Sequence, residues 1–410
     1  MSGIYPANPA ARWISFRNER AAKGEKPWTY LAVCPNSAAV AAAALVAAQE
    51  AQAPIMLTAT LNQVDWEEAY TGWTQDAFRS WLASEIKERN FNEPLIVELD
   101  HGGPWCKDYH RGWPLEKTMA AVKKSMEACV NAGYSLIHVD CSIDPEGLTV
   151  EKAVSRTVEL ISHCESARAS ANLPRIGYEV GTEEIGGTAS FEFVDTVLRL
   201  LKSSLEAAGL SDCWPVFVVA PIGTELHTSR VDVAAARKMC DLVGSHGCVI
   251  KVHFSDNVEN MDVFPGLLIG GVNIGPEFTE IEFGTLAGLE EKERGLVPAG
   301  GESGVSAAIE SAVVESGRWR KWLLKGEGTD FASLSKERRR WLAGTGARYI
   351  WTRPQVLRAR AVLAQNLRKA GIDSEAEVVR RIADRIIKHF KTFNLCGLGP
   401  VLASDGNSAA

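Results

Sequence analysis

The chain has 410 residues, of which 46% are hydrophobic, so it can bury the core of one barrel-sized domain and an additional element. Its formal net charge of −7 argues against nucleic acid or an anionic membrane as the main partner, because either needs a concentrated basic face. We therefore expect a small-molecule partner.

Eight short apolar runs alternate with longer segments of helical periodicity. The runs are residues 29–34, 54–60, 94–100, 135–142, 175–180, 215–221, 247–255 and 270–275. Between them, apolar residues recur at three-to-four spacing, as in 118–133, 150–163 and 193–209. Because the runs are continuously apolar, they predict a parallel α/β sheet covered by helices, which closes most simply into a (β/α)8 TIM barrel.

An open, doubly wound sheet is the alternative architecture. Its glycine fingerprint Gly-x-Gly-x-x-Gly is absent from the sequence, as is the phosphate loop Gly-x-x-x-x-Gly-Lys-Ser/Thr. We therefore expect neither NAD nor ATP as a cofactor.

The strand signal ends near Gly301, and helices are predicted at 303–317, 335–342, 353–370 and 374–390. The predicted organisation is an N-terminal segment 1–27, a catalytic barrel 28–300, a helical extension packed on the barrel 301–395, and a flexible tail 396–410. A basic cluster at 336–340 is most simply a solvated helix face rather than an anion site.

Cysteine usage and the N-terminal sequence favour a cytoplasmic protein. The nine cysteines are scattered and contain no Cys-x-x-Cys pair, which indicates reduced thiols rather than a disulfide framework or a zinc ribbon. Residues 1–20 lack a signal core, and the Ala-rich segment 37–53 is too weakly hydrophobic to span a bilayer.

Polar side chains gather at the predicted carboxyl ends of the strands, where TIM barrels place their chemistry. The third strand ends on Asp100-His101 and two glycines, the fifth carries Glu179, and the sixth and seventh lead to His227 and His253. Adjacent strand residues point to opposite sides, so one member of the Asp-His pair could bind metal while the other handles protons. An isolated pair would more simply cap a helix, but the other titratable strand ends favour chemistry.

Three histidines at separate strand ends, His101, His227 and His253, predict one divalent metal site. Neutral imidazole is a common metal ligand, and a three-histidine site leaves a coordination position open for substrate. We expect zinc first, with manganese, cobalt or nickel as alternatives. His138 lies inside its strand, two residues before Asp140, and is expected to have a hydrogen-bonded core role.

A set of motifs in this order resembles a known family. The motifs occupy residues 59–65 (Ala-Thr-Leu-Asn-Gln-Val-Asp), 70–74, 100–104 (Asp-His-Gly-Gly-Pro), 132–142, 176–180, 226–228 and 273–276. From about Cys34 to Leu367 the chain is similar to the family of the so-called non-catalytic subunit of class II tagatose-bisphosphate aldolase. Some members of that family are metal-dependent ketose 4-epimerases acting on tagatose 6-phosphate or tagatose.

The same family is distantly similar to class II aldolases, and the resemblance implies roles by position. Asp100 would be the acid/base group, and His101, His227 and His253 would be the metal ligands. Glu179 would be a second acid/base group or a metal contact.

Two features depart from the class II aldolase pattern. Residues 254–257 (Phe-Ser-Asp-Asn) replace a glycine-serine-rich anion cradle, and Glu277, Glu280 and Glu282 follow the eighth strand. Acidic groups near a helix start disfavour phosphate at the usual barrel position. The segment 300–304 (Gly-Gly-Glu-Ser-Gly) could instead offer backbone N–H groups to an anion, so phosphorylation of the substrate stays open.

We therefore predict an isomerase, a ketose epimerase that inverts C4 of a ketohexose or its 6-phosphate of the tagatose and fructose type. The C4 hydrogen is too far from the C2 carbonyl for simple enolisation, so retro-aldol cleavage between C3 and C4 is the simplest route. Five polar residues are predicted to bind the substrate: Asn62, Gln63, Asp140, Ser142 and Asn273.

Two alternative functions are compatible with the same candidate site residues. One is a non-catalytic accessory subunit whose partner is a separate class II tagatose-bisphosphate aldolase. The other is a true class II ketose (bis)phosphate aldolase, which differs in releasing two trioses. We also expect the protein to form a homo-oligomer.

Overall fold

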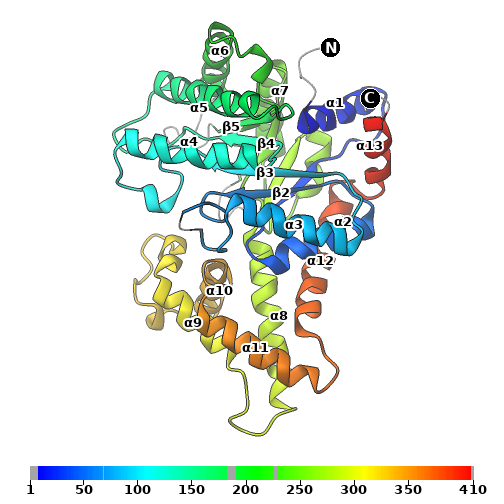
Figure 1. Ribbon diagram of the computed structural model, residues 1–410, viewed down its shortest axis with the longest axis vertical. Coiled ribbons are helices and arrows are strands. Elements are labelled where there is room, and N and C mark those ends of the chain that lie inside the picture. The colour runs from blue at the N-terminus through cyan, green and yellow to red at the C-terminus, as the bar shows by residue number, and fades with distance from the viewer. Residues whose placement is uncertain (1–7, 68, 182–190, 225–229, 408–410) are drawn as a thin grey trace.

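The structure is a computed structural model that describes residues 8–67, 69–181, 191–224 and 230–407. Its centre is a closed barrel of eight parallel strands (Figure 1). The strands are β1 (Tyr30–Val33), β2 (Ile55–Thr60), β3 (Leu95–Gly102), β4 (Leu136–Val139), β5 (Gly177–Gly181), β6 (Phe217–Val219), β7 (Val249–Val252) and β8 (Gly271–Ile274). Because β1 pairs with both β2 and β8, no sheet edge remains and the predicted TIM barrel is confirmed.

The strands coincide with the eight apolar runs of the sequence. They are buried along nearly all of their length, as expected where one face fills the barrel and the other contacts helices. Two strands run past the predicted ends, because Gly102 of β3 pairs with Val139 and Gly181 of β5 pairs with Val219.

Helices follow the strands and cover the barrel (Figure 1). They are α2 (Ala38–Ala51), α3 (Gln75–Arg89), α4 (Leu115–Asn131), α5 (Val150–Ser170), α6 (Phe191–Ala207), α7 (Val233–Ser245) and α8 (Pro276–Arg294). Four begin at a side chain that accepts a backbone N–H of the first turn: Ser37, Thr74, Thr149 and Asp232. Among the described residues, none of the helices has the length and apolar composition that crossing a membrane requires.

An N-terminal helix, α1 (Pro9–Ala22), covers the amino-terminal ends of the strands. Its fully buried Arg17 donates from Nη1 to the carbonyl oxygen of Ile269, just before β8, at 2.8 Å. The Tyr30 hydroxyl at the start of β1 donates to the carbonyl oxygen of Trp13 at 2.9 Å. This helix lies in the predicted segment 1–27 and closes the barrel at the end opposite its chemistry.

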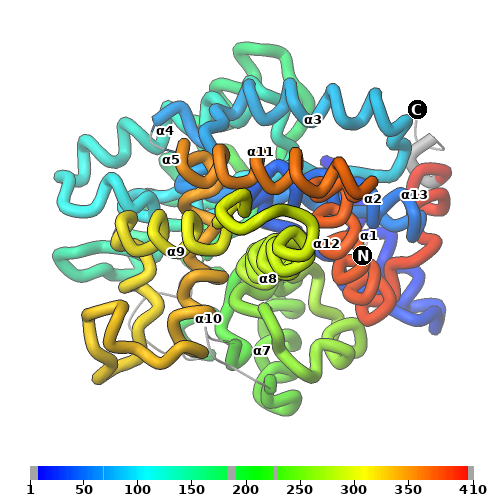
Figure 2. The backbone as a smooth tube through the Cα atoms, turned by 90° about the horizontal axis from the view of Figure 1, so that it is seen from below, coloured from blue at the N-terminus to red at the C-terminus, as the bar shows by residue number. Residues whose placement is uncertain are grey.

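The C-terminal extension contains α9 (Val305–Ser316), α10 (Lys336–Gly346), α11 (Pro354–Arg368), α12 (Ser374–Thr392) and α13 (Leu398–Asn407). The long α8 runs from the barrel into this extension, and α12 returns to pack against α2 and α8 (Figures 1 and 2). Glu282 of α8 accepts from the Ser37 hydroxyl at 2.6 Å and pairs with Arg360 of α11 at 2.7 Å. The limits predicted for the barrel, 28–300, and for the extension, 301–395, remain predictions. Helix α13 lies within the segment 396–410 that the sequence predicts as a tail.

Candidate active site

A bulge at the end of β3 turns Asp100 and His101 toward the same cavity. The pairing of β3 with β4 shifts register there, and His101 adopts a left-handed φ of 47°. A Cβ on Gly103 would lie 1.5 Å from the carbonyl oxygen of Asp140, so only glycine permits this close approach. Asp100 and His101 both line a cavity of about 460 Å³, so the expectation that they point to opposite sides is wrong.

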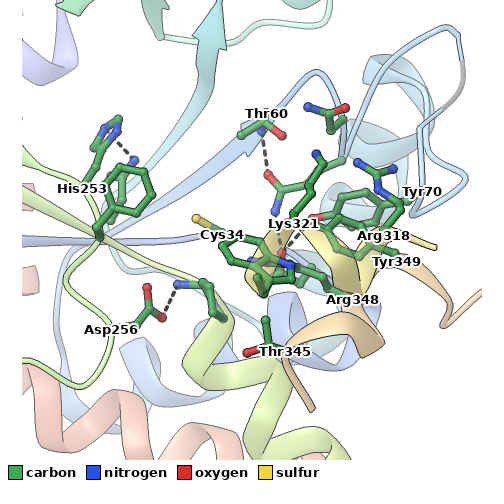
Figure 3. A pocket seen from close by; sticks show the side chains of 18 of the residues that line it. Cys34, Thr60, Tyr70, His253, Asp256, Arg318, Lys321, Thr345, Arg348 and Tyr349 are labelled. Carbon is green, nitrogen blue, oxygen red and sulfur yellow. Dashed lines mark hydrogen bonds between the residues drawn. The ribbon is translucent and has the colours of Figure 1, made fainter. Parts of the chain in front are cut away.

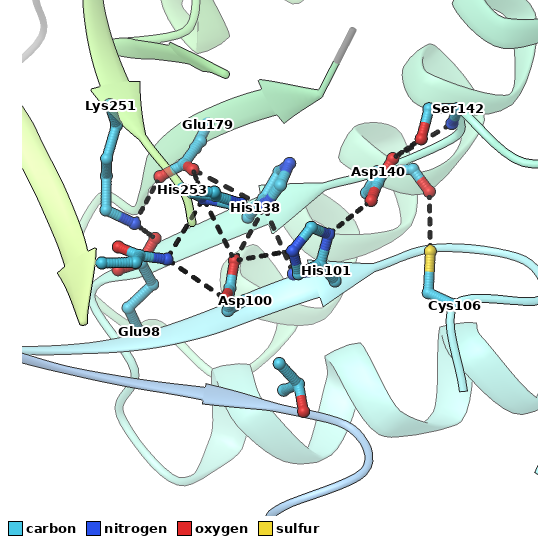
Figure 4. A network of polar contacts seen from close by, with 12 residues as sticks. Glu98, Asp100, His101, Cys106, His138, Asp140, Ser142, Glu179, Lys251 and His253 are labelled. Atoms are coloured by element: carbon cyan, nitrogen blue, oxygen red, sulfur yellow. Dashed lines mark hydrogen bonds and ion pairs between the residues drawn. The ribbon is translucent and has the colours of Figure 1, made fainter. Parts of the chain in front are cut away.

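Three imidazoles surround the Asp100 carboxylate (Figure 4). One ligand atom from each of Asp100, His101, His138 and His253 lies within 4.8 Å of the others. His138 Nδ1 is 3.0 Å and His253 Nε2 is 3.7 Å from Asp100 Oδ1. Nitrogen and carboxylate oxygen donors in this number suit a divalent transition metal, so the residues fit such an ion. The predicted ligand His227 lies outside the described residues.

His138 belongs to this cluster, although its position inside a strand predicted only a core role. It is fully buried, and among the described residues its Nε2 has no hydrogen-bond partner. A buried ring nitrogen without a partner is unusual, so His138 is a further candidate ligand beside its contact with Asp100.

A carboxylate behind His101 holds its imidazole. His101 Nδ1 lies 2.6 Å from Asp140 Oδ2, and Asp140 Oδ1 accepts from the backbone N–H of Ser142 at 3.0 Å and from its hydroxyl at 2.5 Å. Burial opposes the charge of Asp140, but His101 and His138 hold its pKa well below the ordinary value. Such a pairing fixes which ring nitrogen faces a metal. Asp140 and Ser142, predicted to bind substrate, thus support His101 and are not among the residues that line the cavity.

Beneath the imidazoles, a fully buried lysine joins two glutamates. Lys251 Nζ lies 2.6 Å from Glu98 Oε1 and 2.8 Å from Glu179 Oε2. Burial disfavours the Glu179 carboxylate, but Lys251 and the neighbouring His138 and His253 hold its pKa below the ordinary value. Burial also raises the pKa of Glu98 well above the ordinary value. Glu179 Oε1 is 3.3 Å from His253 Nε2, but Glu179 does not line the cavity.

The other predicted substrate residues, Asn62, Gln63 and Asn273, line the cavity. Asn273 Nδ2 donates to Asp100 Oδ2 at 3.1 Å and lies 3.1 Å from His253 Nε2. Its Oδ1 is buried and, in the described part of the chain, receives no hydrogen bond. Asn273 can therefore accept a hydrogen bond from a substrate hydroxyl beside the cluster.

The helical extension forms the opposite wall of the cavity (Figure 3). Its lining residues are Arg318, Lys321, Trp322, Trp341, Thr345, Arg348 and Tyr349. The sequence interpretation missed these side chains, because it looked for basic charge at 336–340. The mixture of arginine, lysine and tryptophan at 318–322 is the signal that could have indicated a binding surface rather than a solvated face.

At both helix starts considered as anion positions from the sequence, carboxylates of the chain itself accept backbone N–H groups. Asp256 Oδ1 accepts from the backbone N–H groups of Gly275 at 3.1 Å and Glu277 at 2.8 Å, at the start of α8. In the 300–304 segment, the Gly300 N–H donates to Glu302 at 2.7 Å, and Ser303 donates to Glu293. The backbone N–H groups of Gly275 and Glu277 at the start of α8 are therefore taken by Asp256. An anion site in the 300–304 segment stays a prediction, because only two of its N–H groups are seen to bind a carboxylate.

The fold and the site together define a TIM-barrel protein with a candidate metal centre at the carboxyl ends of its strands. The chain belongs to the family described as D-tagatose-1,6-bisphosphate aldolase subunit GatZ/KbaZ-like, whose model matches residues 17–380. The resemblance drawn from the sequence motifs is thereby confirmed.

Two solved structures show the same fold. One is described as a probable tagatose 6 phosphate kinase from Sinorhizobium meliloti 1021; it is 22% identical, with a TM-score of 0.74, and the match covers 90% of this chain and 100% of that chain. The other is a fructose-bisphosphate aldolase from Campylobacter jejuni, 12% identical, with a TM-score of 0.53, over 94% of this chain and 95% of that chain. At these identities the similarity concerns the fold alone.

Proposed function

We propose that this protein is a metal-dependent ketose 4-epimerase that interconverts C4 epimers of a ketohexose or its 6-phosphate, of the tagatose and fructose type. The observation that carries the proposal is that Asp100, His101 and His253 face one cavity whose opposite wall comes from the extension. Membership of a family linked to tagatose-bisphosphate aldolase supports a ketose substrate.

The reaction begins at the C4 hydroxyl of the bound ketose. Asp100 accepts its proton, the C3–C4 bond breaks, and the electron pair of that bond passes toward the C2 carbonyl. The aldehyde fragment turns, the bond re-forms on its other face, and Asp100 returns the proton. The His101, His253 and His138 imidazoles favour the ionised form of Asp100, lowering its pKa against the effect of burial, so it can accept a proton at neutral pH.

His101 and His253, with His227, Glu179 and the further candidate His138, would hold the divalent ion. Zinc, manganese, cobalt or nickel would stabilise the negative charge that develops on the three-carbon fragment. Asp140 and Ser142 keep the His101 ring oriented, and Lys251 keeps Glu179 ionised beside His253. Because Glu179 does not line the cavity, its position favours the metal-contact role over proton transfer with substrate.

Retention of the aldehyde distinguishes an epimerase from an aldolase. The cavity is walled by the strand ends on one side and by the extension on the other (Figure 3), which favours recombination over escape. The other alternative is an accessory subunit. Burying charged groups is costly, and a subunit that only supports another protein has no need to bury Glu98, Asp100, Glu179 and Lys251 together.

The test is incubation of the metal-loaded protein alone with tagatose, fructose and their 6-phosphates, followed by separation of all ketoses and trioses. We expect equilibration of the C4 epimers without accumulation of trioses. Accumulating trioses would assign an aldolase. A protein inactive with every metal, which nevertheless raises the activity of an added class II aldolase, would assign the accessory role.

A further inference from the structure

The end of the cavity formed by the extension, together with Asn36 of the loop after β1, presents hydrogen-bond donors that lack acceptors. Within the described ranges, Nε and Nη2 of Arg348, Nε1 of Trp322 and Nδ2 of Asn36 are buried without a hydrogen-bond partner. All three side chains line the cavity. Buried donors in folded proteins are nearly always paired, so a ligand that brings several acceptor oxygens would complete this wall.

Arg348 is the most constrained of these donors. Only 7% of the residue is exposed, and its guanidinium carbon lies 4.4 Å from the ring centre of Trp322 and 5.0 Å from that of Tyr349. In the part of the chain that the structure describes, no carboxylate forms an ion pair with it. Burial opposes its charge, but Tyr349, Tyr70 and the more distant Asp256 raise its pKa above the ordinary value. A buried guanidinium without a carboxylate partner is costly, and an anionic ligand would remove that cost.

Two further cations stand at the same wall. Arg318 and Lys321, both from the short helix 318–322, pair with one carboxylate, Asp108, which also lines the cavity. Arg318 additionally lies over the Tyr349 ring, with its guanidinium carbon 4.1 Å from the ring centre. This wall therefore carries more positive charge than Asp108 compensates.

Besides Asp100 and Asp108, two carboxyl groups line the cavity, Asp256 and Glu280, and both already accept hydrogen bonds. Asp256 accepts backbone N–H groups at the start of α8, and Glu280 accepts from the Thr345 hydroxyl at 2.7 Å. Burial raises the pKa of both groups, that of Asp256 to about 7, so they carry less negative charge than ordinary carboxylates at neutral pH. Asp256 and Glu280 therefore repel an anionic ligand less strongly than two fully ionised carboxylates would.

We propose that this end of the cavity is a phosphate subsite, in which Arg348, Trp322 and Asn36 bind the phosphate of a phosphorylated ketose. The proposal rests on the proposed epimerase function, and it names the substrate class as ketose phosphates. A phosphate monoester offers three acceptor oxygens and matches the planar guanidinium better than a neutral hydroxymethyl group does. Because Asp256 occupies the start of α8, the anion site moves from the barrel to the extension.

The first experiment measures binding without turnover. Inorganic phosphate and tagatose 6-phosphate are titrated by calorimetry into the wild type, Arg348→Met, Trp322→Phe and the control Arg320→Met. Arg320 is exposed on the same short helix and does not line the cavity. We expect Arg348→Met to weaken phosphate binding by about 30-fold or more, Trp322→Phe to weaken it less, and Arg320→Met to bind as the wild type.

The second experiment compares kcat and KM for tagatose and for its 6-phosphate. Arg348→Met should raise KM for the phosphate ester by about 30-fold while leaving KM for the free sugar nearly unchanged. If Arg348→Met does not fold, Trp322→Phe gives the same comparison, because it removes one donor and keeps the ring. Equal use of both sugars by the wild type, without phosphate binding, would overturn the subsite and leave the epimerase function standing.

The remaining outcomes separate the two proposals. Phosphate binding that depends on Arg348, in a protein that converts no ketose with any metal, would support the subsite and contradict the epimerase function. A ketose with a 6-carboxylate that binds as tightly as the 6-phosphate would overturn the assignment to phosphate. Equal phosphate binding by Arg348→Met and the wild type would overturn the proposed subsite directly.

Discussion

Lys251 holds Glu179 in place beneath the histidine cluster of the candidate metal centre. Lys251 Nζ contacts Glu179 Oε2 at 2.8 Å, while the other carboxylate oxygen lies 3.3 Å from His253 Nε2 (Figure 4). Burial opposes the charge of Lys251, but Glu179 and Glu98 raise its pKa above the ordinary value. The ammonium is therefore a fixed positive charge that orients Glu179 toward His253, and it is not a candidate nucleophile.

Lys251→Met is expected to lower the free energy of unfolding by about 3–5 kcal/mol, because two buried carboxyl groups lose their cation. The measurement is urea unfolding at neutral pH, with Lys202→Met, which removes an exposed lysine, as the control. The control should change stability by less than about 0.5 kcal/mol. Equal stability of Lys251→Met and the wild type would show that the buried pair is not needed for the fold.

The strand ends of the site were predictable because local sequence specifies them. An apolar run fixes a buried strand, and the residues that follow it, such as Asp100, Glu179 and His253, must then lie at one end of the barrel. The bulge that brings His101 beside Asp100 was not predictable, because it depends on the close approach of Gly103 to Asp140 across two strands.

The contribution of the extension to the cavity could not be predicted from local sequence patterns either. Periodicity predicts that α10 forms, but not which part of the barrel it covers. The pairing of Asp108 with Arg318, and the burial of Arg348 against Trp322, join segments that are distant in sequence or that follow no repeating pattern. Such contacts appear only when the chain is folded.

Purified protein is expected to hold about one divalent ion per chain. His101→Ala and His253→Ala should each lose the ion, and His227→Ala should do so as well if it completes the site. The measurements are elemental analysis and circular dichroism, with His163→Ala on α5 as a control that keeps the ion. Full metal occupancy in His253→Ala would remove it from the ligand set.

Asp100→Asn separates proton transfer from metal binding. The amide keeps the shape of the side chain but cannot accept the C4 hydroxyl proton, so kcat should fall by roughly 10²- to 10⁴-fold. Metal content should persist, because the imidazoles remain. Asp241→Asn, an exposed change on α7, is the control and should leave kcat unchanged. Near-normal turnover of Asp100→Asn would assign the proton transfer to another group.

Asp256 predicts a specific pH dependence of stability. Burial raises its pKa from an ordinary 3.8 to about 7 in the folded protein, so its contribution to stability is present below about pH 4 and is lost as the pH rises to 7. Asp256→Asn keeps an oxygen for the backbone N–H groups of Gly275 and Glu277 but stays neutral. Relative to the wild type, the variant should gain stability between pH 4 and 7.

The gain should level off above pH 7 at roughly 4 kcal/mol. Urea unfolding at pH 5 and pH 8, in buffers without phosphate, measures the difference between the two proteins. The same difference at both pH values would mean that Asp256 is ionised throughout the range, as an ordinary carboxyl group is.

A deuterium label at C4 of the ketose tests whether the C3–C4 bond or the C4–H bond breaks. In retro-aldol cleavage the C4 hydrogen stays on its carbon, because the aldehyde fragment carries it through the turn. Tagatose 6-phosphate labelled at C4 should therefore give fructose 6-phosphate that retains the deuterium in ordinary water, as measured by mass spectrometry or NMR. Direct deprotonation at C4 would exchange the label with solvent, and oxidation at C4 would show a primary isotope effect. Retention without a primary isotope effect would place the proton transfer, which we assign to Asp100, at the C4 hydroxyl oxygen rather than at the carbon.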